Sequence, residues 1–98
     1  MTKRFMYPRA RRLLKINLFE QQSGQCCYCG RAVDLHPSPW ATGERTPDHF
    51  ATIEHLRRIA DGGTNDPDNL AIACFACNGS RGAMNWVAFK TLMSMRAA

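Results

Sequence analysis

Two pairs of cysteines constrain the fold of this chain more than any other feature of its sequence. Each pair has the spacing Cys-x-x-Cys: Cys26 and Cys29 in CCYCG, and Cys74 and Cys77 in CFACN. One such pair presents two thiolates from a single tight turn, and two pairs complete the tetrahedral site that a structural Zn²⁺ prefers. The spacing therefore predicts a structural zinc site, with redox-active or core cysteines as the alternative interpretation.

The size of the chain makes such a metal site valuable. A chain of 98 residues builds only a modest apolar core. Structural Zn²⁺ contributes on the order of 10–16 kcal/mol in small zinc-binding peptides, which exceeds the stability of a typical domain. We therefore expect chelation to unfold the protein.

Gly30 and Gly79 follow the two pairs and suit the backbone of tight turns. Cys27, the fifth cysteine, is expected to be a small buried apolar residue.

Apolar periodicity and turn residues divide the chain into expected elements. Apolar residues at helical spacing predict one helix over 10–22 and another over 82–96. Strands are expected over 49–56 and 70–74, although the second segment also suits a simple approach to the second cysteine pair. Two segments rich in proline, glycine and asparagine are predicted loops: 36–47 and 60–69. The sequence thus predicts a small α+β protein, in which two cysteine turns clamp a β-β-α unit between N- and C-terminal helices.

Positive charge gathers near the beginning of the sequence. The formal net charge is +5, and six basic residues precede the first acidic one: Lys3, Arg4, Arg9, Arg11, Arg12 and Lys15. A one-sided basic cluster is typical of a surface that binds a polyanion, so we expect Arg11, Arg12 and Lys15 to contact nucleic acid. Residues 1–12 are interpreted as a basic arm that orders on DNA. The alternative interpretation is a solvated helix face.

The sequence also bears on location and domain number. No apolar run approaches the length of a membrane span, so no membrane partner is expected. Residues 1–19 are basic and poor in acidic residues, as targeting peptides are, but Lys15 and Asn17 interrupt their apolar stretch. We predict a cytoplasmic protein with reduced thiols. One domain over 1–98 is expected, with a zinc-clamped core over 26–82.

Polar residues suited to metal-assisted chemistry lie between and beside the cysteine pairs. Glu54 and His55 are adjacent in TIEHL, Asn69 follows in DPDNL, and Asn78 comes directly after the second pair. Histidine can accept a proton near neutral pH, and carboxylate and amide oxygens are ligands that hard cations such as Mg²⁺ prefer. On a regular strand, however, Glu54 and His55 point to opposite faces. A shared site therefore requires the strand to end or bulge there.

The segments CCYCG and TIEHLRRIADGGTNDPDNLAIACFACNGSRG resemble the HNH endonuclease family, in its zinc-stapled form with two Cys-x-x-Cys pairs. The resemblance covers residues 26–82. It implies a ββα-metal (His-Me finger) fold. It also implies an enzyme that hydrolyses DNA phosphodiester bonds with one divalent cation, by nicking or by double-strand cleavage. Family members of this size resemble phage, prophage and restriction-type nucleases.

The resemblance also implies roles for individual residues. His55 matches the general base that activates water, whereas Glu54 and Asn78 match ligands of a catalytic Mg²⁺ or Mn²⁺ that stabilises the phosphate and the 3′ leaving oxygen. Asn69 matches the residue that stabilises the loop between the strands and orients the base. Two positions vary: the residue before the base is often Asp in the family, and Asn78 stands where the third motif residue is often His.

Three arginines close to the motif are candidates for contacts with DNA. Arg81 in NGSRG matches a basic position of the family and implies a phosphate contact, with an ordinary solvated arginine as the alternative. Arg57 and Arg58 flank the proposed base, and at least one of them is expected to face DNA. The alternative is a surface pair.

A second function class fits much of the same sequence. A non-catalytic, zinc-stabilised nucleic-acid-binding module would show the same charge and cysteine pattern. Binding alone does not require His55, Asn69 and Asn78 together, so their joint presence favours the nuclease. A redox or zinc-storage protein leaves the basic cluster and the Glu-His pair unexplained. A domain this small has little surface for reading bases. Cleavage is therefore weakly specific, or a protein partner or homodimer supplies the specificity.

Overall fold

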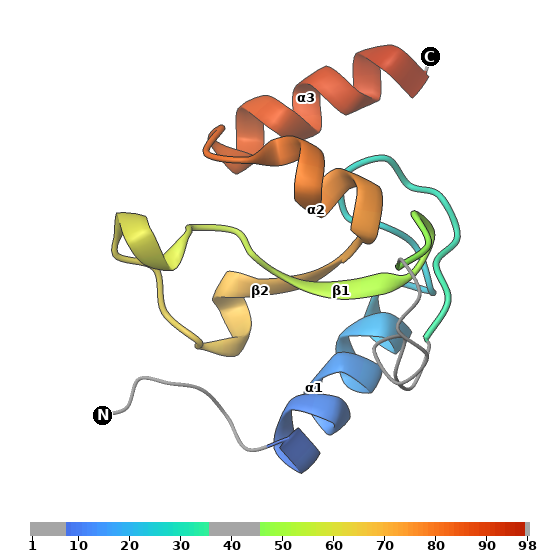
Figure 1. Ribbon diagram of the computed structural model, residues 1–98, viewed down its shortest axis with the longest axis vertical. Helices are drawn as coiled ribbons and strands as arrows, with labels where there is room; N and C mark the ends of the chain where they lie inside the picture. The colour runs from blue at the N-terminus through green and yellow to red at the C-terminus, as the bar shows by residue number, and fades with distance from the viewer. Residues whose placement is uncertain (1–7, 36–45, 98) are drawn as a thin grey trace.

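The computed structural model describes residues 8–35 and 46–97. Its helices and strands are α1 (Pro8–Gln21), β1 (Ala51–His55), β2 (Leu70–Cys74), α2 (Phe75–Arg81) and α3 (Trp86–Ala97). Two short 3₁₀ helices, η2 (Ile59–Asp61) and η3 (Pro67–Asn69), lie between the strands. In Figure 1, α1 covers one face of the sheet, and α2 with α3 lies on the other. The predicted fold class, a small α+β protein with a ββα core and flanking helices, is confirmed.

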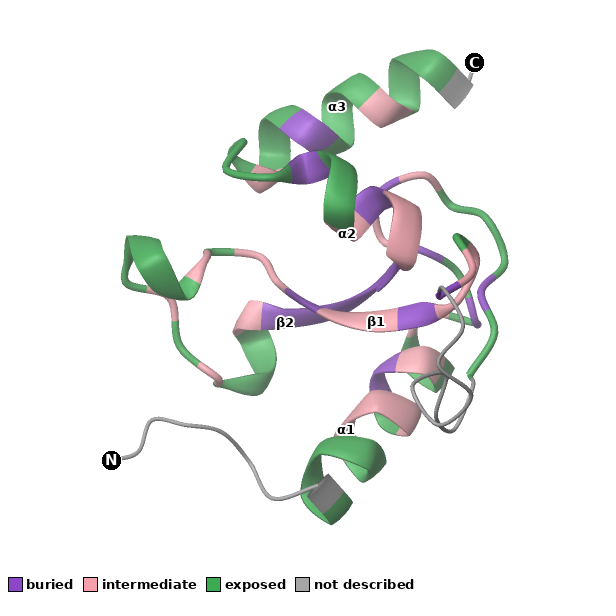
Figure 2. Cartoon of the chain, viewed as in Figure 1, coloured by how far each residue is buried: buried purple, intermediate pink, exposed green. Residues whose placement is uncertain are grey.

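The two strands form an antiparallel sheet in unbroken register. The pairing runs from Ala51 opposite Cys74 to His55 opposite Leu70, one residue to one. All five residues of β2 are buried, because helices cover both of its faces, as Figure 2 shows. This explains why its sequence, LAIAC, is a continuous apolar run rather than an alternating one. Ile72 and Cys74 are fully buried at the centre of the apolar core.

The end of α1 is fastened to this core. Ser23 and Gly24, just past the helix, adopt positive φ angles, 56° and 70°, which the helix cannot continue through. Just before them, the Gln22 side chain pairs with the backbone of Ile72: its Nε2 donates to the carbonyl oxygen at 3.0 Å, and its Oε1 accepts from the amide at 2.8 Å. Leu18 is buried nearby. The amide of Gln22 thus supplies the hydrogen bonds that a further strand would make.

One helix was not predicted, and another begins later than expected. The segment after β2 forms α2, because the second cysteine pair is itself the first turn of a helix: Cys74 is the N-cap, and its Sγ accepts from the Cys77 amide at 3.4 Å. Gly79 therefore lies inside this helix and not in a turn. The helix ends at Gly82, which has a φ of 55°, so the expected helix over 82–96 begins only at Trp86.

α3 packs on the core through one face. Phe89 is buried and meets the Tyr28 ring edge-on, with ring centroids 4.9 Å apart. The Lys90 ammonium donates to the Cys27 carbonyl oxygen at 2.8 Å. The side-chain Oδ1 of Asn85 accepts from the amides of two residues in the first turn, which satisfies free donors at the start of the helix.

Several expectations fall partly outside the described residues. Residues 8–12 of the interpreted basic arm form the start of α1, whereas residues 1–7 lie outside the described part of the chain. Most of the predicted loop over 36–47 is also outside it. Of the helices that the structure describes, none has the length and apolarity needed to cross a bilayer.

Among the glycines that the structure describes, Gly63 leaves the least room for a side chain. A Cβ added there would overlap the Arg57 carbonyl oxygen and lie 2.7 Å from the carbonyl carbon of the same residue. We expect Gly63→Ala to lower the free energy of unfolding by about 1–3 kcal/mol, as overpacking does. Gly79→Ala is the control, because a Cβ there meets nothing within 4 Å and a helical Gly→Ala change stabilises by roughly 0.5–1 kcal/mol. Urea unfolding of the zinc-loaded variants measures both, and equal stabilities would contradict the expectation.

Candidate functional site

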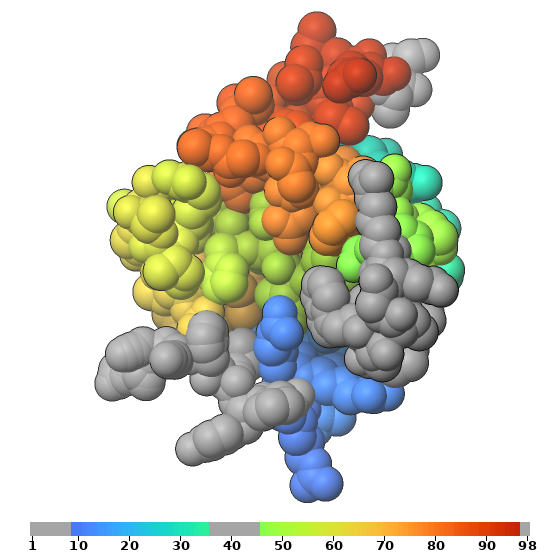
Figure 3. All heavy atoms as spheres, in the orientation of Figure 1, coloured from blue at the N-terminus to red at the C-terminus, as the bar shows by residue number. Residues whose placement is uncertain are grey.

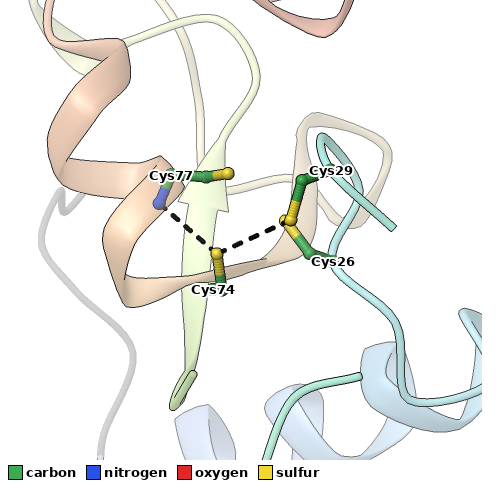
Figure 4. Close-up of side chains that lie close together, drawn as sticks. All are labelled: Cys26, Cys29, Cys74 and Cys77. Carbon is green, nitrogen blue, oxygen red and sulfur yellow. Dashed lines mark hydrogen bonds between the residues drawn. The ribbon is translucent and has the colours of Figure 1, made fainter. Parts of the chain in front are cut away.

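The two cysteine pairs converge on one point. The Sγ atoms of Cys26, Cys29, Cys74 and Cys77 all lie within 4.8 Å of one another. Figure 4 shows the first pair on the segment after α1 and the second at the junction of β2 and α2. With Zn–S bonds of about 2.3 Å, a regular tetrahedron separates its sulfurs by about 3.8 Å. The Sγ atoms of Cys29 and Cys74 are 4.0 Å apart. The four thiol groups therefore fit a metal such as Zn²⁺.

Local hydrogen bonds shape each cysteine turn. In the first turn the Tyr28 amide donates to Cys26 Sγ at 3.3 Å, and the Gly30 amide donates to the Cys26 carbonyl oxygen at 3.1 Å. Gly30 has a φ of 78°, which confirms the backbone role predicted for it. The second turn has the equivalent N–H···S bond between Cys77 and Cys74. Backbone N–H groups thus orient the Cys26 and Cys74 sulfurs by hydrogen bonding to them.

Cys27 lies outside the cluster of four sulfurs and is half-buried. A hydrogen bond with the Cys27 thiol lowers the pKa of Cys26 to about 4. The same hydrogen bond, followed by burial, raises the pKa of Cys27. Cys27 therefore stays a neutral thiol beside a thiolate, consistent with its expected part as a small apolar residue.

Glu54 lies on β1, and its side chain is buried on the face of the strand that α2 covers. Its Oε2 accepts two hydrogen bonds, from the Tyr28 hydroxyl at 2.6 Å and from Arg81 Nη1 at 2.8 Å. Burial, and then the carboxylate itself, raise the pKa of Tyr28, so the phenol remains a donor. Arg81 and Glu54 are each 6% exposed. A buried carboxylate is tolerated here because a guanidinium and a hydroxyl compensate its lost hydration.

The structure gives Arg81 a different place from the phosphate contact suggested by the sequence. Every nitrogen of its guanidinium donates to a protein acceptor, within 3.0 Å in each case. These acceptors are the Glu54 carboxylate, the Tyr28 hydroxyl and the carbonyl oxygens of His55, Leu56 and Met84. Arg81 is therefore a buried clamp between α2 and the end of β1, with all three guanidinium nitrogens engaged by the protein.

Asn78 forms a second bridge between the same two elements. Its Nδ2 donates to Thr52 Oγ1 at 2.9 Å. Thr52 and Glu54 alternate on β1 and so share a face, while Asn78 and Arg81 are three residues apart on α2 and share a side. The structure thus brings Glu54 and Asn78 into one layer, between β1 and α2.

One oxygen of each residue is left over in this layer. Within the described chain, Glu54 Oε1 and Asn78 Oδ1 make no hydrogen bond. Among the described residues, no side-chain oxygen is both fully buried and without a hydrogen bond. Since these two oxygens make no hydrogen bond, they keep contact with solvent. A carboxylate and an amide oxygen in one layer fit the ligand preference of Mg²⁺ or Mn²⁺.

His55 occupies the last position of β1. The sequence required β1 either to bulge or to end at Glu54-His55 if the two residues were to share a site. The unbroken register excludes a bulge, and the strand ends at His55. By the alternation of strand side chains, the imidazole leaves on the face opposite Glu54. Its Nε2 lies 2.7 Å from Asn65 Oδ1. His55 is therefore adjacent to the carboxylate in sequence, but it is not in the layer with Asn78.

Asn69 ties the loop between the strands together. Its Oδ1 accepts from the Arg57 amide at 2.9 Å, and its Nδ2 donates to the carbonyl oxygens of Arg57 and Thr64 at 3.0 and 2.8 Å. This is the hydrogen-bonding role that the sequence suggested for it. Sequence reasoning did not single out Tyr28, Thr52 or Asn65, and no spacing signal marks them.

The remaining basic candidates differ in availability. Arg11, Arg12 and Arg57 are exposed, although Arg57 Nε donates to the Asp61 carbonyl oxygen. Arg58 is paired with the Asp61 carboxylate at 2.9 Å. Lys15 is half-buried, and burial, followed by the charge of Arg11, lowers its pKa. Helix α1, which carries Arg9, Arg11, Arg12 and Lys15, lies on the face of the sheet opposite α2 (Figure 1).

Comparison with protein families identifies the chain. The family model described as HNH endonuclease matches residues 26–83, more than half of the chain. The match spans both cysteine pairs, both strands and α2. No curated protein matches the chain.

Metal removal tests the cysteine cluster. We expect one Zn²⁺ per chain by elemental analysis, and loss of the circular-dichroism signal when a strong chelator removes it, because the cluster joins the segment after α1 to β2 and α2. Cys29→Ser is expected to lower the zinc content. Cys27→Ser, the matched control, should keep both metal and fold. A chain that stays folded after complete loss of zinc would contradict the prediction.

The Arg81 clamp has a measurable contribution to stability. Arg81→Met leaves the Glu54 carboxylate buried without its cation, so we expect the free energy of unfolding to fall by about 3–5 kcal/mol. Arg58→Met breaks only an exposed ion pair and should change stability little. Urea unfolding of the zinc-loaded proteins measures the difference. Similar losses for both variants would show that burial of the pair does not matter.

Proposed function

The chain belongs to the HNH endonuclease family, and we propose that it is a metal-dependent endonuclease that hydrolyses DNA phosphodiester bonds. The observation that carries the proposal is the layer between β1 and α2, where Glu54 Oε1 and Asn78 Oδ1 are free to bind a cation next to the strand end that bears His55. A single Mg²⁺ or Mn²⁺ would supply, when bound there, stabilisation of the charge on the phosphate and on the 3′ leaving oxygen.

Each residue of the proposed site has a distinct task. Glu54 and Asn78 would hold the cation through their free oxygens. Arg81 and Tyr28 keep the other carboxylate oxygen occupied, so Glu54 can offer only Oε1. His55 accepts the proton of the attacking water, and Asn69 holds the loop beside it. The products would carry a 5′-phosphate and a 3′-hydroxyl.

The exposed basic residues would supply the affinity for DNA. Arg11 and Arg12 on α1 and Arg57 after β1 present positive charge to solvent. Arg58 and Lys15 would contribute less, because both are half-buried and Arg58 is paired with Asp61. Contacts of this kind neutralise phosphates and do not read bases. We therefore propose weakly specific cleavage in the cytoplasm, unless a protein partner or a homodimer provides specificity.

A non-catalytic nucleic-acid-binding module is the second candidate. Two observations favour it: the Glu54 carboxylate already has a buried cation in Arg81, and His55 leaves β1 on the opposite face. Such a module would bind DNA through the same basic residues and cleave nothing.

Plasmid nicking separates the two candidates. We expect wild-type protein to nick plasmid DNA with Mg²⁺ or Mn²⁺, and His55→Ala to lose about 10²–10⁴-fold in rate, the usual contribution of a general base. His49→Ala is the control, because His49 is half-exposed and pairs with Asp34. Equal nicking by wild type and His55→Ala would refute the proposal. DNA binding without cleavage in any metal would support the second candidate.

A further inference from the structure

The imidazole of His55 has a side-chain partner outside the HNH motif. Its Nε2 lies 2.7 Å from the Oδ1 of Asn65, and both residues are half-buried. This separation is short for a hydrogen bond between a ring nitrogen and an amide oxygen, so the contact restricts rotation of the ring.

The loop holds Asn65 in place from both sides. On one side, the Thr64 carbonyl oxygen accepts from Asn69 Nδ2 at 2.8 Å, and Thr64 Oγ1 accepts from the Asp66 amide at 3.2 Å. On the other side, the Asp66 carbonyl oxygen accepts from the Asn69 amide at 2.8 Å. The residues flanking Asn65 are therefore both anchored by Asn69. The central asparagine of the motif thus acts on the base through this second asparagine.

An amide oxygen decides which ring nitrogen carries the proton. Because Asn65 Oδ1 can only accept, the neutral ring of His55 keeps its proton on Nε2, and its lone pair lies on Nδ1. Rotation of the amide by half a turn would place Nδ2 there and force the opposite tautomer. The orientation of one amide therefore selects the atom of His55 that can accept a proton.

We propose that Asn65 is the positioning residue of the general base: it holds His55 with Nδ1 free to take the proton from water. This inference depends on the proposed function. The water O–H bond breaks and its proton moves to Nδ1. The hydroxide oxygen bonds to phosphorus as the bond to the 3′ oxygen breaks, and the 3′ oxygen leaves with that electron pair and takes a proton from solvent. The protonated ring donates from both nitrogens, so its bond to Asn65 survives the transfer and the ring need not turn.

Direct observation of the imidazole tests the geometry without any need for cleavage. In ¹⁵N-labelled, zinc-loaded protein, we expect the neutral His55 ring to carry its proton on Nε2, with that proton protected from solvent exchange. His55→Ala assigns the signal among the three histidines. Asn65→Ala should remove the protection, whereas Asn65→Asp keeps an acceptor oxygen and should retain it. A proton on Nδ1 in the wild-type protein would overturn the proposal.

Cleavage kinetics test the role. Loss of a hydrogen bond that orients a functional imidazole typically costs roughly 10- to 100-fold in activity. We expect Asn65→Ala to lose that much in kcat with KM for DNA nearly unchanged, and Asn65→Asp to restore most of it. Asn17→Ala, an exposed change on α1, is the control.

The outcomes separate the two proposals. Wild-type kcat in Asn65→Ala, with the ring protection lost, would overturn the role of Asn65 and leave the nuclease intact. A wild-type protein that cleaves no DNA in any divalent cation would overturn both.

Discussion

The convergence of four thiol groups at the junction of β2 and α2 determines the rest of the structure. Cys74 is at once the last residue of β2, the N-cap of α2 and a member of the cluster. α2 has only seven residues, too few to be stable as an isolated helix. Its position therefore depends on the cysteines at its start and on Arg81 at its end. Between those two anchors the helix can present Asn78 to β1 in only one way.

Burial of Arg81 illustrates a competition between folding and binding. A basic residue just after the last motif residue suits a phosphate contact, but here the α2 helix turns it inward to Glu54 and to three carbonyl oxygens. Those carbonyl oxygens belong to His55 and Leu56 at the end of β1 and to Met84 after α2. At such ends of helices and strands the backbone would otherwise lack hydrogen-bond partners. One side chain thus satisfies the polar groups of two element ends. As a result, Arg81 adds no exposed positive charge, whereas Arg11 and Arg12 on α1 and Arg57 after β1 remain exposed.

Sequence reasoning succeeded where a pattern has one physical solution. Matched Cys-x-x-Cys pairs predicted the cluster, the short apolar run LAIAC predicted a strand, and apolar periodicity over 10–22 predicted α1. It failed where the same residues suit two structures. The second cysteine pair suited a loop turn as well as a helix start, which hid α2, and nothing in NGSRG distinguishes a buried arginine from an exposed one. In TNDPDN, the sequence assigned Asn69 its place in the loop, but only the folded loop shows that Asn65 meets His55.

The sheet has consequences for how adjacent residues on opposite faces could act together. Within the described chain it has two strands, so each of them has an outer edge. In Figure 3, atoms coloured for the region of β1 reach the surface between the blue atoms of α1 and the orange atoms of α2. The strand ladder stops at His55, although the next residue, Leu56, still donates its amide to the Asn69 carbonyl oxygen at 2.9 Å. A phosphate lying along this edge would meet the oxygens of Glu54 and Asn78 on one side and the imidazole on the other. The proposed site therefore requires a phosphate that reaches both faces of β1 at the strand end.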